Sequence, residues 1–262
     1  MLRAISPASC GSRSPSPSPP RTKNTALRQL PATLAPFAEH VTRWFWLRYR
    51  SPALGEHLRV RIQGSNPDAL RAHVLPLLTT WCADLHAQRL AGQGLLEPYT
   101  PEAERYGGRQ ALTAAEEAFA ADSAFVISCL DHAASREDRL LLTAVSAWDI
   151  ARVVATDQQR ALHGRQLTAD ERRVRETLRP RLRTAAAEPE ALIAAPLAAT
   201  WHDRHKALAA YHAALPDSAQ SSLCASDLVH MHANRLLGLD PAAERITRSL
   251  ATDLLHAHAA RQ

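Results

Sequence analysis

The chain has 262 residues, and 46% of them are hydrophobic, which is enough for one large domain or two small ones with a buried core. No apolar run reaches the roughly 18 residues that a membrane-spanning helix needs, so we expect a soluble protein without membrane contact. The four cysteines are scattered without a Cys-x-x-Cys pair, which argues against a zinc cage or disulfide scaffold and fits a reducing cytoplasm.

The formal net charge is +5, and arginine supplies nearly all of the positive charge, because Lys23 and Lys206 are the lysines of the chain. The arginines are spread among glutamates along segments with helical patterning. A dispersed basic surface of this kind is weak evidence for nucleic acid, and an acidic peptide is an equally compatible partner. We therefore expect no direct contact with nucleic acid.

The N-terminal segment is rich in proline and serine and too poor in apolar residues to form a core. Its composition predicts a disordered tail over residues 1–25, followed by one folded domain over residues 26–262. The tail lacks the apolar centre of a secretory signal, and an N-terminal targeting role is the alternative interpretation.

Two β-rich runs, 44–49 and 57–62, flank a turn-like segment at 51–56, and together they predict a hairpin. Alternation along the second run places His57, Arg59 and Arg61 on one face. The residues between them are apolar and face a core. A strand with three such side chains on one face can hold an anion, which from this pattern alone is a phosphate, a carboxylate or a peptide.

Beyond the hairpin the apolar spacing is helical. Helices are predicted at 67–91 and 109–130, and then at about 135–160, 169–186, 188–215, 226–237 and 241–258, with Ser226 as a candidate N-cap and Gly238 as a stop. The predicted fold class is α+β, a helix-dominated single domain with a small antiparallel sheet near the N-terminus.

Arg105 lies beside the Gly107-Gly108 break, just before a predicted helix start. Flexible backbone and free amide groups at such a break let an anionic ligand approach closely. The simpler interpretation is a surface loop in which Arg105 pairs with Glu102 or Glu104.

The segment 226–237 carries a His-x-His pair, His230 and His232. Residues two apart lie about 200° apart around a helix, so the pair does not favour chelation and no metal site is expected. His230 and Asn234 are one turn apart on a face away from the apolar residues, where they can act together. His232 falls within the apolar arc, which predicts a packed, hydrogen-bonded histidine.

Five segments in the same order resemble one family, the C-terminal, glutamate-elimination domain of the lantibiotic dehydratases, as found in small stand-alone proteins of thiopeptide-type bacteriocin biosynthesis. The resemblance runs from about residue 42 to the C-terminus. The segments that carry it are Trp44–Tyr49, His57–Arg61, Tyr99–Gly108, Phe119–Ser123 and His230–Leu236.

In this family a partner domain esterifies serine or threonine of a ribosomal precursor peptide with glutamate from glutamyl-tRNA, and the elimination domain removes the glutamate to leave dehydroalanine or dehydrobutyrine. The resemblance implies a lyase that needs no cofactor. It assigns proton transfer to His230 and glutamyl binding with leaving-group stabilisation to Arg59, Arg61 and Arg105. Which residue takes the α-proton is left open by the sequence.

Asn234 and His57 lie beside this set and are further candidates for substrate binding. Nothing in the sequence resembles the large glutamylating domain, so the implied partners are a glutamylated precursor peptide and a separate tRNA-dependent glutamylating subunit. Homo- and hetero-oligomers are both compatible with the sequence.

Two alternatives come from the same resemblance. Some stand-alone relatives close the six-membered nitrogen ring of thiopeptides by a [4+2] cycloaddition of two dehydroalanines and release the leader peptide. That reaction expels no glutamate and gives no reason to keep three glutamate-handling arginines. The other alternative is a non-catalytic peptide-binding subunit of a split dehydratase, which would need only helix surfaces.

Overall fold

The structure is a computed structural model that describes residues 20–92, 94–133 and 135–261. Its contacts divide the chain into two compact units, Met1–Thr100 and Pro101–Gln262, which we take in turn. Residues 1–19 of the predicted tail lie outside the described residues. The remainder of that segment, from Pro20, belongs to helix α1 (Pro20–Leu34), so the predicted boundary at residue 25 falls within a helix.

The predicted hairpin is confirmed in the first unit. Strands β1 (Arg43–Ser51) and β2 (Gly55–Gln63) pair antiparallel, with Leu47 opposite Arg59. Gly55 has a φ of 60°, a conformation that glycine adopts without steric cost at the turn. The alternation also holds, because the apolar side chains of β2 are buried in the core: Leu58, Val60 and Ile62.

The helices of the first unit differ from the prediction. The predicted helix 67–91 is three consecutive pieces: α2 (Pro67–Ala69), a π-helical turn (Leu70–Val74) and α3 (Leu75–Ala87). Pro76 has no N–H to bond the carbonyl four residues earlier, and the ladder widens just before it. Helix α1 was not predicted, although Leu27, Leu30 and Leu34 recur at helical spacing and are buried.

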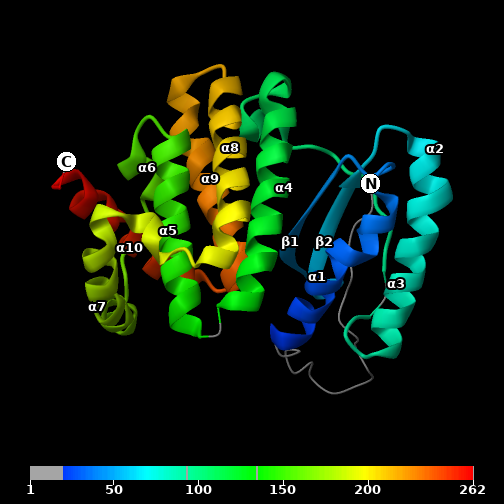
Figure 1. Cartoon of the computed structure of the whole chain (residues 1–262), viewed down its shortest axis with the longest axis horizontal. Coiled ribbons are helices and arrows are strands. Elements are labelled where there is room, and N and C mark those ends of the chain that lie inside the picture. Colours follow the sequence, from blue (N-terminus) through cyan, green and yellow to red (C-terminus); the bar gives the residue numbers. More distant parts are fainter. Residues whose placement is uncertain (1–19, 93, 134, 262) are drawn as a thin grey trace. The chain divides into compact units, whose positions relative to one another are not determined.

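The second unit is helical throughout its regular structure. Its helices are α4 (Arg109–His132), α5 (Arg136–Val154), α6 (Gln158–Leu162), α7 (Ala169–Thr184), α8 (Ala198–Ala214), α9 (Ser218–Leu237) and α10 (Pro241–Ala259). Helices α4, α5, α8 and α9 lie side by side, and α10 packs against α5 and α7 (Figure 1). Trp148, Phe125 and Tyr211 are fully buried between them.

Two predicted helix starts are wrong. Helix α9 begins earlier than predicted, at Ser218, so Ser226 lies inside the helix and is not its N-cap. Helix α8 begins later, at Ala198, because Pro189 and Pro196 hold the preceding segment in short 3-10 turns. The stop at Gly238 is confirmed by its φ of 88°, which suits a glycine just past a helix end.

The α+β class with helix dominant is confirmed, with one two-stranded antiparallel sheet among the described residues. Within that same part of the chain, no helix combines the length and the apolar character needed to cross a membrane.

Candidate functional site

The strand face of the first unit carries the predicted cations. His57 is only 2% exposed, and its Nδ1 lies 3.0 Å from the Gly55 carbonyl oxygen. The Arg59 Nε–H donates to His57 Nε2 over 3.4 Å. Together these contacts assign a neutral imidazole with the proton on Nδ1. His57 therefore orients Arg59 from within the strand.

Aromatic rings fix the two arginines of this face. The Arg59 guanidinium carbon lies 3.2 Å from the ring centre of Tyr49, and that of Arg61 lies 4.6 Å from Tyr99. Cation–π contact of this kind restricts the orientation of a guanidinium. Tyr49 and Tyr99 are site residues that the sequence analysis did not predict. The cross-strand pairing of Tyr49 with His57 was the available signal.

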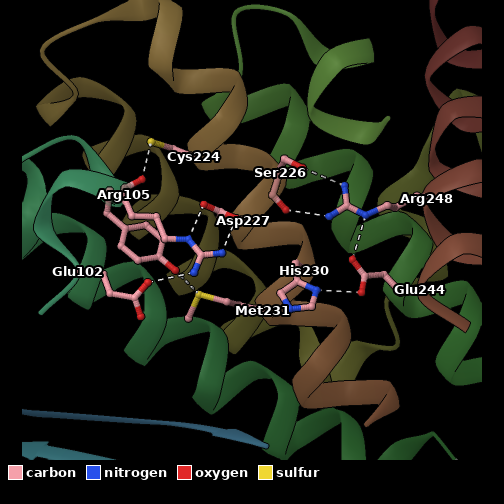
Figure 2. Close-up of polar contacts among 10 residues, drawn as sticks. Glu102, Arg105, Cys224, Ser226, Asp227, His230, Met231, Glu244 and Arg248 are labelled. Carbon is pink, nitrogen blue, oxygen red and sulfur yellow. Dashed lines mark hydrogen bonds and ion pairs between the residues drawn. The ribbon is translucent and has the colours of Figure 1, made fainter. Parts of the chain in front are cut away.

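Arg105 is held by two carboxylates in the second unit (Figure 2). Its Nε and Nη2 each donate to Asp227 over 2.7 Å, and its Nη1 donates to Glu102 over 3.0 Å. The hydrogen bond to Asp227 raises the pKa of the guanidinium further above its ordinary value. The predicted pairing with Glu102 is confirmed, while Asp227, on α9, supplies the two-point contact. Within the described part of the chain, these contacts use three of the five N–H donors, which leaves two for a ligand.

One stripe of helix α9 carries Asp227, His230 and Asn234, which stand at i, i+3 and i+7. The His230 side chain is 52% exposed, and its Nδ1 lies 2.8 Å from Oε2 of Glu244 on α10. Asn234 is half-buried on the next turn. The helix thus brings the partner of Arg105 and the predicted catalytic histidine onto a single face, as Figure 2 shows.

His232 occupies the opposite environment. It is fully buried, and its Nδ1 lies 2.7 Å from Asp122, which also accepts from Arg235 Nη1 over 2.7 Å. Its predicted role as a packed, hydrogen-bonded histidine is confirmed. The two histidines of the His-x-His pair therefore have separate carboxylate partners. Among the described residues, no group of three or more histidine, cysteine or acidic side chains is placed to hold a metal ion.

Sequence and structure comparisons agree on a single family. A family described as lantibiotic biosynthesis dehydratase C-term matches residues 18–255. The subtilin biosynthesis protein SpaB of Bacillus subtilis is 35% identical over 92 residues, which are 34% of this chain and 8% of SpaB. The chain thus spans a small part of the curated relative that it matches.

Among solved structures, the tRNA-dependent lantibiotic dehydratase MibB from Microbispora sp. 107891 is similar with a TM-score of 0.75 and 26% identity, over 99% of this chain and 28% of MibB. TbtD, the pyridine synthase of thiomuracin biosynthesis, has a TM-score of 0.58 and 16% identity over 99% of both chains, a likeness of fold. Since the family match covers most of its residues, this chain belongs to the lantibiotic biosynthesis dehydratase C-terminal family.

Proposed function

We propose that this chain eliminates glutamate from glutamylated serine or threonine residues of a ribosomal precursor peptide, which leaves dehydroalanine or dehydrobutyrine. One observation carries the proposal. In a chain of this family, a half-exposed histidine and the carboxylate that anchors Arg105 share one stripe of helix α9. A proton-transfer group and a carboxylate-binding group are the two functions that this elimination requires.

The reaction balances without an added oxidant or reductant. A base removes the α-proton of the esterified residue, and the electrons of the Cα–H bond form the Cα=Cβ double bond. The Cβ–O bond breaks, and glutamate leaves as a carboxylate that keeps the electron pair of the Cβ–O bond. Negative charge develops first next to the amide carbonyl and then on the leaving group, so fixed cations lower the barrier.

The residues divide this work by their chemistry. Arg59 and Arg61 bind the free carboxylate of the glutamyl group, for which their aromatic neighbours restrain them. Arg105 stabilises the departing carboxylate with its two remaining donors. His230 transfers a proton, because an imidazole gains and loses a proton near neutral pH. His57 supports Arg59, and Asn234 offers an amide one turn from His230 for the peptide.

The proposal implies partners and a location. MibB is described as tRNA-dependent, and this chain covers 28% of it. We propose that a separate tRNA-dependent subunit glutamylates the precursor peptide and that this chain receives the ester in the cytoplasm. The chain itself would then need no nucleic acid.

The test is direct. The purified protein is incubated with a synthetic peptide that bears one glutamylated serine, and the peptide mass is followed. Loss of one glutamic acid to give dehydroalanine is the expected result. A peptide that is bound but returned unchanged would replace the proposal with a non-catalytic binding subunit.

A second candidate is cyclisation of two dehydroalanines to a pyridine ring with release of the leader peptide. The fold likeness to TbtD over nearly the whole of both chains favours it. A peptide with two dehydroalanines and no glutamyl ester separates the candidates. Ring closure in that peptide would support cyclisation, whereas an elimination enzyme leaves it unchanged.

A further inference from the structure

His230 is one half of a histidine–carboxylate pair between two helices. Its Nδ1 lies 2.8 Å from Glu244 Oε2, and the histidine side chain is 52% exposed while the glutamate is 21% exposed. The Glu244 carboxylate is therefore the more buried member of the pair, and the His230 imidazole is the more exposed one. Glu244 lies in the first turn of α10, where the helix dipole also favours a negative charge.

A buried arginine binds the other carboxylate oxygen of Glu244. Arg248, one turn further along α10, donates from Nε to Glu244 Oε1 over 3.0 Å. Its Nη1 donates to the Ala161 carbonyl over 2.9 Å and its Nη2 to the Ser226 carbonyl over 2.8 Å. Each oxygen of Glu244 thus has its own partner, as Figure 2 shows together with the contact of Arg248 to Ser226. The contact to Ala161 on α6 anchors Arg248 to a second helix.

These contacts determine which nitrogen of His230 carries a hydrogen. Burial would raise the pKa of Glu244, but the hydrogen bond with His230 and the charge of Arg248 hold it below its ordinary value. An ionised carboxylate only accepts hydrogen bonds, so Nδ1 must be the protonated nitrogen. Nε2, on the other side of the ring, is then the nitrogen that can take or give a proton.

We propose that Glu244 is a positioning residue that holds His230 in its Nδ1–H tautomer and that Arg248 fixes Glu244 in turn. The inference rests on the proposed function, because it assigns the elimination step to Nε2 of His230. A carboxylate bonded to one ring nitrogen of a histidine sets its tautomer and ring orientation. In metal sites, the loss of such a partner typically costs roughly 10- to 100-fold in activity, and we expect an effect of that size here.

The test combines a spectroscopic and a kinetic readout on the full chain. Protein with ¹⁵N-labelled histidine is examined by long-range ¹H–¹⁵N correlation, with His230 assigned by the signals missing in His230→Gln. We expect the Nδ1–H tautomer in the wild type and in Glu244→Gln, whose amide oxygen still accepts. We expect a shift towards the Nε2–H tautomer in Glu244→Ala.

In the elimination assay, Glu244→Ala should lower kcat roughly 10- to 100-fold while the KM for the glutamylated peptide changes little. The decrease in kcat should be smaller in Glu244→Gln than in Glu244→Ala. The matched control is Glu171→Gln, which alters another glutamate–arginine pair that involves α10, that of Glu171 on α7 with Arg245 on α10, without touching His230.

The outcomes separate this inference from the proposed function. A wild-type protein that eliminates no glutamate but shows the Nδ1–H tautomer, lost in Glu244→Ala, overturns the function and supports the pairing. Unchanged tautomer and unchanged kcat in Glu244→Ala overturn the positioning role. If circular dichroism shows that Glu244→Ala does not fold, Arg248→Lys is tested in its place. A wild-type tautomer and a wild-type kcat in Arg248→Lys would overturn the role assigned to Arg248.

Discussion

Arg105 and Asp227 are joined by two hydrogen bonds of 2.7 Å, from Nε and Nη2 to the two oxygens of one carboxylate. The residues are far apart in sequence, and the contact ties the 3-10 turn Ala103–Tyr106 to helix α9. The planar guanidinium matches a carboxylate at two points, and an ammonium does not. The two-point geometry, and not the positive charge alone, therefore requires arginine at this position.

Replacing Arg105 with lysine keeps the charge but loses the two-point contact with Asp227. Displacement of a group in a reaction site by about 1 Å can cost roughly 100-fold, so we expect elimination to fall by about that factor with the fold intact. Mass spectrometry of the accumulating glutamyl ester measures the effect. The control is Arg109→Lys on the exposed start of α4, and equal activity in the two variants would contradict the assignment.

On the hairpin, Arg59→Ala and Arg61→Ala should each raise the KM for the glutamylated peptide and let the ester accumulate, because a carboxylate-binding guanidinium is lost. Hydrogen bonds to charged groups contribute about 1.5–3 kcal/mol, equivalent to a loss of roughly 10- to 150-fold in kcat/KM. Arg50→Ala is the matched control. Arg50 is an exposed residue of the same hairpin that pairs with Glu56 and, by strand alternation, lies on the other face.

The two histidines of α9 should respond in opposite ways to the same substitution. His230→Gln removes an exposed side chain, so the fold should persist while elimination is lost. His232→Gln disturbs the buried bond to Asp122 and should lower the free energy of unfolding by about 1–3 kcal/mol. Urea denaturation and the elimination assay on both variants test this contrast. If His230→Gln lowers the stability and His232→Gln abolishes elimination in a stable fold, His232 is the functional histidine and His230 the structural one.

Stability should fall in acid through Asp122. Burial would raise the pKa of this carboxyl, but His232, Arg235 and Arg204 hold it well below its ordinary value. The unfolded chain then binds the proton more readily. The contribution of ionised Asp122 to the free energy of unfolding is complete above roughly pH 4, which is near the ordinary pKa of an aspartate. This contribution is lost as the pH falls towards the pKa of Asp122 in the folded state.

Asp122→Asn should be less stable than the wild type at neutral pH by about 3–5 kcal/mol, because it leaves buried cations without their partner. Urea midpoints between neutral pH and about pH 2 measure the difference, which should narrow in acid. A constant difference across that range would show that Asp122 does not titrate as described.

The features that depend on local spacing can be predicted from the amino-acid sequence. Alternation along β2 placed His57, Arg59 and Arg61 on one face, and helical spacing placed His230 with Asn234 and His232 on the apolar side. These follow from the repeat of a strand or a helix, which is a property of consecutive residues. The α+β class followed from the same periodicities.

The hydrogen-bond partners of those residues depend on how the helices pack and cannot be predicted from local spacing. Asp227 for Arg105 and Glu244 for His230 come from different elements, and packing of whole helices brings them within hydrogen-bonding distance. The start of α9 was mistaken for the same reason. Ser226 has the chemistry of an N-cap, but the helix runs through it and Ser226 binds Arg248 of α10 instead. A local pattern shows which face a side chain occupies, and the packed neighbour sets its hydrogen bonds and its ionisation.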